Sequence, residues 1–229
     1  MPHGLGDAWY DIRCAYSDIP AVYDSTNRII SLGMDTAWRE DVVCIASHLV
    51  RKGRRALVLD AGSGTGAMSE IMAGKTKITP VLFDYSIAML KKARGKKERI
   101  QGVFEALPFR DSTFDCILMG FSLHAARDME RSVSELSRVS RGVIAIVGFG
   151  KPGKGLKRVA GEAYLRYAIP ALASLSAGKR SASYHNIYRI YERLPENQET
   201  ARIISKGFYK IMFREKALGT IIQYVGSKR

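Results

Sequence analysis

Apolar runs that alternate with helix-patterned segments occupy the middle of the chain and restrict the folds it can adopt. The runs have the length and composition of strands and lie at 56–59, 78–83, 100–104, 114–119 and 143–149. Helical patterns follow at 86–94 and 131–140. Strands that alternate with helices need crossover connections, which give a mainly parallel sheet with helices on both faces. Several runs are apolar throughout, as strands buried on both faces are.

The flanking segments are predicted to complete a single domain. Residues 17–50 carry apolar side chains at helical spacing, and two short strands are predicted at 209–214 and 219–225. The tyrosine-rich stretch 157–194 is predicted to be helical and to form a lid inserted after the fifth strand. We therefore predict an α/β fold with a Rossmann-like, seven-stranded, mainly parallel sheet. An N-terminal helical cap, the core, the lid insertion and a C-terminal strand pair are expected at 1–50, 51–150, 151–207 and 208–229.

Composition limits the environment and the partners. The chain has 229 residues, and no apolar run approaches the length of a transmembrane helix. Its three cysteines are scattered, which suits neither a disulfide framework nor a zinc site, and no apolar leader opens the sequence. We expect a cytoplasmic protein. Its net charge of +14 favours contact with polyanions, either nucleic acid or an anionic membrane surface, although many soluble enzymes are simply basic.

A glycine-rich stretch, LVLDAGSGTGAMSEIM at 57–72, joins the first strand to the next helix. As G-x-G-x-x-A, with Gly62, Gly64 and Ala67, it matches a dinucleotide-binding fingerprint. As D-x-G-x-G-x-G, from Asp60 to Gly66, it resembles the first motif of class I S-adenosylmethionine-dependent methyltransferases. A plain tight turn in an α/β protein is the third interpretation.

The context of this loop favours the methyltransferase motif. Asp60 would repel a pyrophosphate but can attract the α-ammonium group of S-adenosylmethionine. Asp84 ends the second strand, where a carboxylate can accept both ribose hydroxyls, although a helix N-terminus also favours an acidic residue. The stretch EALPFRDSTFD at 105–115 resembles a further element of these enzymes. All three elements fall at the carboxyl ends of strands, where open α/β sheets bind their ligands.

A narrower resemblance extends over nearly the whole chain. VYDSTNRIISLGMDTAWR at 22–39 is similar to a segment of the ubiquinone/menaquinone-biosynthesis C-methyltransferases. Further stretches that resemble this family are GFGKP, YAIPALASL, SASYHNIYRI and RLPENQE, at 148–152, 167–175, 181–190 and 193–199. The resemblance implies an S-adenosylmethionine-dependent enzyme that C-methylates a lipophilic quinol or phenol. Such an enzyme requires no metal, and the sequence shows no metal-ligand cluster.

The resemblance implies a set of cofactor-binding residues. Where the family commonly has a polar residue before the glutamate, this chain has Val103 and Phe104, and Phe104 is expected to pack on the adenine. The residues expected to bind the cofactor are Tyr23, Asp60, Gly62, Ser63, Gly64, Thr65, Gly66, Asp84, Tyr85, Met89, Val103, Phe104, Glu105, Gly120 and Phe121.

One departure from the family concerns the expected catalytic residues. The family usually carries an arginine–asparagine pair after the fourth strand, where this chain has His124 and Ala125. A histidine has a pKa near neutrality and is suited to act as the base for a phenolic proton. Tyr184 and Asp24 are expected to orient the hydroxyl or the cofactor. The alternative for His124 is a partly buried histidine at a helix cap.

The methyl acceptor has a rival interpretation. An RNA or other small-molecule methyltransferase would use the basic surface. Against it, the sequence contains no Asn/Asp-Pro-Pro-Tyr/Phe tetrapeptide, the motif of amino-group methylating enzymes. Cys116 falls inside a predicted strand, where it is poorly placed for covalent attack on an RNA base. A cofactor-binding protein without methyl transfer is a third class. We favour the quinol, with peripheral contact to an anionic membrane, and leave open whether the chain forms a homo-oligomer. The cations expected at that membrane are Lys151, Lys154, Lys157, Arg158, Lys179 and Arg180.

Overall fold

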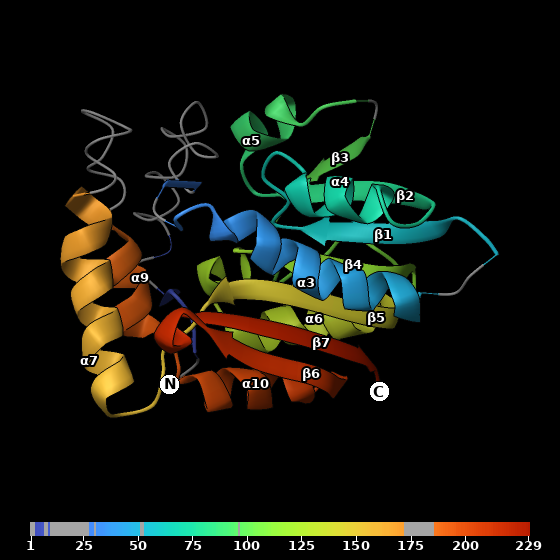
Figure 1. Cartoon of the computed structure of the whole chain (residues 1–229). Helices are drawn as coiled ribbons and strands as arrows, with labels where there is room; N and C mark the ends of the chain where they lie inside the picture. Colours follow the sequence, from blue (N-terminus) through green and yellow to red (C-terminus); the bar gives the residue numbers. More distant parts are fainter. Residues whose placement is uncertain are drawn as a thin grey trace.

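The computed structural model describes residues 3–6, 9, 28–29, 31–50, 53–95, 97–171 and 186–229. Within these ranges the centre is a seven-stranded sheet of order β3-β2-β1-β4-β5-β7-β6 (Figure 1). The strands span Ala56–Ala61 (β1), Ile78–Asp84 (β2), Glu98–Gln101 (β3), Phe114–Gly120 (β4), Ser140–Phe149 (β5), Phe208–Lys216 (β6) and Ile221–Lys228 (β7). Strands β1 to β5 pair in parallel, and β7 runs antiparallel to β5 and β6. The predicted seven-stranded, mainly parallel sheet is confirmed.

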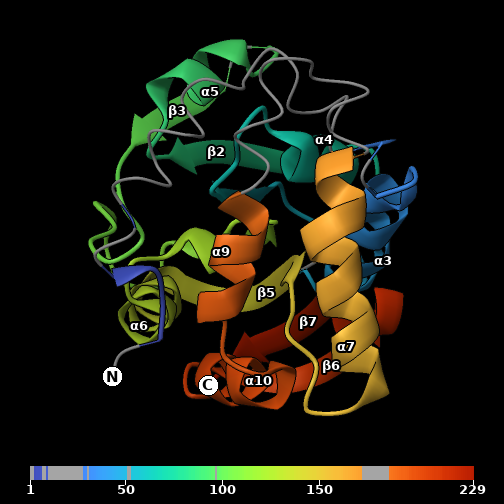
Figure 2. The ribbon, with the colours of Figure 1, turned by 90° about the vertical axis from the view of Figure 1, so that its left-hand side faces the viewer.

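Helices cover both faces of this sheet. Helices α3 (Met34–Leu49) and α4 (Ala67–Ala73) lie on one face, and α6 (Met129–Val139) and α10 (Asn197–Ser205) lie on the other (Figure 2). The short helix α5 (Ile87–Lys92) packs beside β2 and β3. Two more helices, α7 (Leu156–Ala163) and α9 (Asn186–Arg193), stand beyond the carboxyl ends of the parallel strands (Figure 1).

The strand sequences explain the two layers of core. Neighbouring side chains of a strand point to opposite faces, so a doubly covered strand must be apolar at nearly every position. In β1, Val58 packs in the cluster under α3 and α4, whereas Leu59 packs in the cluster under α6 and α10. In β4, Leu118 and Ile117 divide in the same way. The continuous apolar runs in the sequence therefore correspond to strands buried on both faces.

Some elements differ from the sequence-based prediction. The third strand spans 98–101 instead of 100–104, and the helical pattern at 157–194 includes a π-helical turn, η3 (Tyr164–Ala168), directly after α7. Residues 197–205, which the sequence placed in the lid insertion, form α10 and pack against α6 and β6. Most of the predicted helical cap before residue 28 lies outside the described residues.

Candidate functional site

A cleft lies at the carboxyl ends of β1, β2 and β4. It encloses about 660 Å³, including open solvent at its mouth. Its wall combines glycine backbone, carboxylates and aromatic rings. The residues that line it are Trp9, Gly62, Gly64, Asp84, Tyr85, Ser86, Met89, Gly102, Val103, Phe104, Glu105, Phe121, Ser122, His124 and Ala125.

The loop between β1 and α4 needs its glycines for two separate reasons. Gly62 and Gly64 have φ angles of +69° and +54°, a left-handed conformation that L-residues other than glycine rarely adopt. A Cβ on Gly62 would lie 2.3 Å from Cβ of Ser122, whose hydroxyl donates a hydrogen bond to the Ala61 carbonyl. A Cβ on Gly64 would contact only Cε of Met89, at 3.4 Å. Gly64 therefore leaves open space in the cleft wall beside Met89.

Asp84 connects this loop to the end of β2. Its carboxylate accepts hydrogen bonds from the backbone N–H groups of Gly64 and Ser86, each at 2.8 Å. Burial raises the pKa of Asp84, and hydrogen bonds from the backbone N–H groups of Ser86, Gly64 and Tyr85 oppose that rise. An ionised carboxylate has about four acceptor sites, so these donors leave capacity for a hydroxyl donor from the cleft. This geometry suits the ribose of a nucleoside-containing cofactor.

Asp60 lies beneath the loop and is not part of the cleft wall. Its side chain is fully buried, and Oδ2 accepts a hydrogen bond from the Ser69 N–H at 2.9 Å. Neither Asp60 Oδ1 nor Ser63 Oγ has a hydrogen-bond partner in the part of the chain that the structure describes. Burial raises the pKa of Asp60 to about 7. Its predicted attraction for an α-ammonium group stays a prediction.

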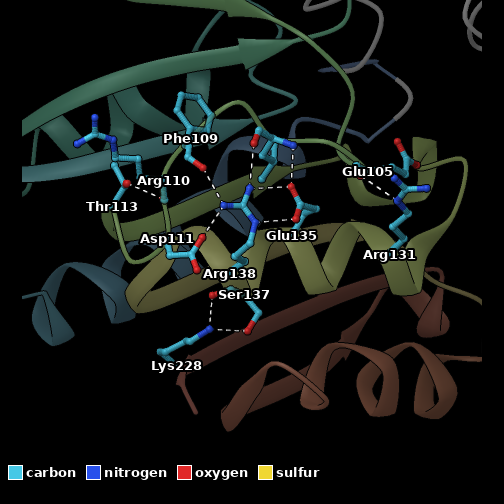
Figure 3. Close-up of polar contacts among 11 residues, drawn as sticks. Glu105, Phe109, Arg110, Asp111, Thr113, Arg131, Glu135, Ser137, Arg138 and Lys228 are labelled. Carbon is cyan, nitrogen blue, oxygen red and sulfur yellow. Dashed lines mark hydrogen bonds and ion pairs between the residues drawn. The ribbon is translucent and has the colours of Figure 1, made fainter.

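The third predicted motif, the stretch EALPFRDSTFD at 105–115, is held against α6 by one arginine (Figure 3). The Arg138 guanidinium donates to both carboxylate oxygens of Glu135, at 2.7 and 2.8 Å, and to Asp111 at 2.8 Å. It also donates to the carbonyls of Leu107 and Phe109. These carboxylates raise the pKa of Arg138, and Arg138 in turn lowers the pKa of Glu135. The residues directly before this loop in the chain form part of the cleft wall, so fixing the loop also fixes that part of the wall.

Glu105 has a structural partner that the sequence did not reveal. Its Oε1 accepts hydrogen bonds from the backbone N–H groups of Arg127, at 2.7 Å, and Asp128, at 2.9 Å. Arg131 donates from Nε to the Glu105 carbonyl at 3.0 Å (Figure 3). Glu105 thus joins the third motif to the loop after β4, which carries His124. It lines the cleft, but this carboxylate oxygen is already engaged.

His124 lies in a short 3₁₀ turn, η2 (Leu123–Ala125), which begins three residues after the last residue of β4. Its side chain is only 4% exposed, and its ring centroid lies 4.7 Å from that of Phe149. Burial lowers the pKa of His124 to about 4, so the imidazole is neutral at pH 7. Nδ1 has no hydrogen-bond partner among the described residues. His124 therefore contributes a neutral imidazole to the cleft wall, and its Nδ1 is buried.

The structure gathers part of the predicted site. The predicted cofactor residues that line the cleft are Gly62, Gly64, Asp84, Tyr85, Met89, Val103, Phe104, Glu105 and Phe121. Those outside its lining are Asp60, Ser63, Thr65, Gly66 and Gly120. The remaining predicted residues, Tyr23, Asp24 and Tyr184, lie outside the described residues. For all of them, cofactor binding or catalysis stays a prediction.

The sequence-based prediction missed Trp9, Ser86, Gly102, Ser122 and Ala125. Four of these directly adjoin predicted positions and could have been included on that ground. Trp9 adjoins none of them, and only the folded chain brings it to the cleft. Over the described ranges, no group of three or more His, Cys, Asp or Glu side chains is placed to hold a metal ion, and no helix is long and apolar enough to cross a membrane.

Two buried groups of this site are expected to give the free energy of unfolding opposite pH dependences. The folded-state pKa of Asp60, about 7, exceeds its ordinary value of 3.8, so its contribution to the free energy of unfolding falls as the pH rises from about 4 to 7. The folded-state pKa of His124, about 4, is below its ordinary value of 6.5, so its contribution to the free energy of unfolding increases as the pH rises from about 4 to 6.5.

Urea unfolding of two variants between about pH 4 and pH 8 separates these contributions. In the parent protein the two contributions offset each other between about pH 4 and 6.5. Asp60→Asn should therefore produce a rise of stability over this range relative to the parent protein, and His124→Gln should produce a decline that continues toward pH 7. Profiles parallel to the parent in both variants would contradict the two pKa shifts.

Comparison with known proteins agrees with this geometry. The model of the ubiE/COQ5 methyltransferase family matches residues 8–228. A demethylmenaquinone methyltransferase of Renibacterium salmoninarum is 33% identical over 179 residues, covering 75% of this chain and 73% of the relative. The ubiquinone/menaquinone biosynthesis C-methyltransferase UbiE of Cronobacter sakazakii is 29% identical, covering 93% of this chain and 88% of the relative.

Solved structures support the fold independently. A putative methyltransferase from Haloferax volcanii, solved with the Trm112 methyltransferase activator, gives a TM-score of 0.64 at 12% identity, covering 93% of this chain and 97% of that one. A SAM dependent methyltransferase from Aquifex aeolicus gives 0.55 at 17% identity, covering 83% and 89%. At these identities the likeness concerns the fold alone. With the match over residues 8–228, the predicted family is confirmed, and this chain belongs to the ubiE/COQ5 methyltransferase family.

Proposed function

We propose that this chain transfers a methyl group from S-adenosylmethionine to a ring carbon of a lipophilic quinol. The observation that carries the proposal is the cleft at the carboxyl ends of β1, β2 and β4. There the glycine backbone and Asp84 fit an adenosine, and His124 lies in the same wall. Relatives named demethylmenaquinone methyltransferase support the quinol as the acceptor class. Bound S-adenosylmethionine supplies a methyl group activated by a positively charged sulfur.

The residues of the chain have separate tasks in binding. Gly62 and Gly64 let the backbone approach the cofactor closely because they carry no Cβ. Asp84 accepts the ribose hydroxyls while its own position is held by the N–H groups of Gly64 and Ser86. Phe104, whose ring lies 6.3 Å from that of Phe83, provides an apolar surface for the adenine. A pre-organised wall of this kind supports catalysis mainly by positioning the reactants.

His124 is proposed as the group that accepts the phenolic hydrogen. A ring carbon becomes a better nucleophile as electron density moves from the phenol oxygen onto the ring. With a pKa of about 4, the imidazole is always available as an acceptor but is a weak base. It therefore acts by hydrogen bonding to the hydroxyl and shares the proton as the methyl group moves from sulfur to the ring carbon. S-Adenosylhomocysteine is the leaving group, and loss of the hydrogen on the methylated carbon as a proton to solvent restores the aromatic ring and the hydroxyl. Tyr184 and Asp24 are proposed to orient the hydroxyl or the cofactor.

The acceptor class is tested by methyl transfer to two extracts in parallel. The protein is incubated with labelled S-adenosylmethionine and either a chemically reduced lipid extract or total RNA. We expect label in the organic phase, only when the quinones are reduced, because the oxidised ring has no phenolic hydrogen to remove. Label in RNA and none in lipid would assign the chain to the rival class. Label in neither, despite cofactor binding, would support a binding protein without transfer.

We propose in addition that the outer face of α7 rests on an anionic membrane surface. Leu156, Val159 and Tyr167 are 84%, 64% and 67% exposed. Leu156 and Val159, three residues apart, lie on one side of α7, and Tyr167 belongs to the π-helical turn η3 that continues it. The cations Lys154 and Lys157, both exposed, lie at the start of this apolar stripe. An apolar face with flanking cations is the pattern of a helix that lies in a membrane interface.

Sedimentation with anionic vesicles is expected to separate two classes of cation. Near an anionic leaflet each cation contributes about 1 kcal/mol, so Lys154→Gln with Lys157→Gln should weaken vesicle binding roughly 30-fold. The matched control is Lys151→Gln with Arg158→Gln, which removes the same charge from two other cations of the six that the sequence predicted at the membrane; the last two, Lys179 and Arg180, lie outside the described residues. Lys151 already donates to the Glu192 carbonyl, and Arg158 pairs with carboxylates, so the control should lose much less. Equal losses would show that only net charge matters.

A further inference from the structure

An N-terminal strap, residues 3–6, lies against the loop that follows His124. The N–H of Leu5 donates to the Ala126 carbonyl at 2.9 Å, and the N–H of Gly6 donates to the Arg127 carbonyl at 3.1 Å. A Cβ on Gly4 would lie only 2.4 Å from the same Arg127 oxygen, so the strap seats closely on this loop. Two backbone hydrogen bonds and a close contact thus fix its position.

The strap is also bound from the side of the insertion. The Arg193 guanidinium of α9 donates to the Leu5 carbonyl at 3.0 Å. The Leu5 side chain is 2% exposed and packs with Ile190 of α9 and with Trp9. Figure 2 shows the strap in blue, beside α6 and α9. The strap therefore links α9 to the loop after β4.

Trp9 reaches the cleft from this strap. It contributes to the cleft wall and packs edge-on against Tyr85, with ring centroids 5.9 Å apart and an interplanar angle of 60°. Tyr85 directly follows Asp84, and Met89 lies one helical turn further along the same wall. Trp9 thus packs on the residue that follows the carboxylate proposed to hold the ribose, and both Trp9 and Asp84 line the same cleft.

We propose that Trp9 contacts the adenosine of the bound cofactor and closes that end of the cleft. This inference rests on the proposed cofactor. An indole ring offers a flat surface on which a purine packs whatever its hydrogen-bonding pattern. Since the strap also contacts α9 and the loop of His124, the docking of Trp9 connects cofactor binding to both sides of the cleft.

Tryptophan fluorescence tests this contact, because the chain has only two tryptophans. In Trp38→Phe, Trp9 is the remaining tryptophan, and saturable quenching by S-adenosylhomocysteine is expected. In Trp9→Phe, which leaves Trp38, the emission should not respond although calorimetry detects binding. Trp9→Ala should raise the Kd for S-adenosylhomocysteine roughly 10-fold, and Trp9→Phe should restore most of the affinity.

A pair of glycine variants tests the strap without touching the cleft. Gly4→Ala should raise the Kd several-fold and reduce the quenching of Trp9, because its Cβ collides with the Arg127 carbonyl. Gly6→Ala is the matched control: Gly6 also has a positive φ, +50°, so this variant shares the backbone strain, but a Cβ there meets nothing within 4 Å. Ligand binding without any change in Trp9 emission would overturn this inference and leave the proposed function standing. No binding of S-adenosylhomocysteine to the parent protein would instead overturn the proposed function.

Discussion

Gly64→Val is expected to weaken the binding of S-adenosylmethionine and S-adenosylhomocysteine by a factor on the order of 100. Gly64 has a φ of +54°, which a β-branched residue adopts only with strain. Its N–H donates to Asp84, so a backbone shift that relieved the strain would also move the carboxylate proposed to hold the ribose. A side chain at this position would in addition enter the cleft beside Met89. Isothermal titration calorimetry measures the effect directly.

Gly53→Val is the matched control for this loop variant. Gly53 also has a positive φ, +93°, but a Cβ there meets nothing within 4 Å, and it precedes β1 at the opposite end of the strand. This control should lose thermal stability and keep its affinity for the cofactor. Unchanged affinity in Gly64→Val would remove the glycine loop from the site. Preferential binding of NAD by the parent protein would favour the dinucleotide interpretation of the same motif.

His124→Ala is expected to lower kcat for quinol methylation by about 10²–10⁴-fold, the usual contribution of a group that handles a proton in the transition state. The affinity for S-adenosylhomocysteine should stay nearly unchanged, because the proposed acceptor contact involves the quinol and not the cofactor. The assay follows methyl transfer to a demethylmenaquinol analogue under reducing conditions. A fall in kcat at constant cofactor affinity would place His124 in the chemical step.

Two further variants sharpen this test. His124→Arg restores the residue common in the family but cannot accept a proton, so it should be about as inactive as His124→Ala. His48→Ala removes an exposed histidine on α3 and should leave the rate unchanged. High activity in His124→Arg would indicate that a positive charge, not an acceptor nitrogen, is what the site needs. Full activity in His124→Ala would remove this histidine from the mechanism and leave the substrate class standing.

Much of the fold and the position of the cleft could be predicted because they follow from local patterns. Strands buried on both faces must be apolar throughout, which made β1, β2, β4 and β5 visible in the sequence. In a parallel sheet the carboxyl ends of neighbouring strands meet at one edge. Because Asp84, Glu105 and His124 follow three such strands, the sequence alone predicted that they would share one site.

Other properties depend on contacts between distant parts of the chain. The sequence predicted Glu105 as a cofactor ligand, but only the fold brings the N–H groups of Arg127 and Asp128 onto its carboxylate. His124 looked like a base with a pKa near neutrality, and its burial against Phe149 changes that to about 4. Trp9 has no neighbouring motif, and the cleft acquires it only because the strap docks on Ala126 and α9. Burial and long-range hydrogen bonding set these chemical states, and neither can be read from residues that are close together in the sequence.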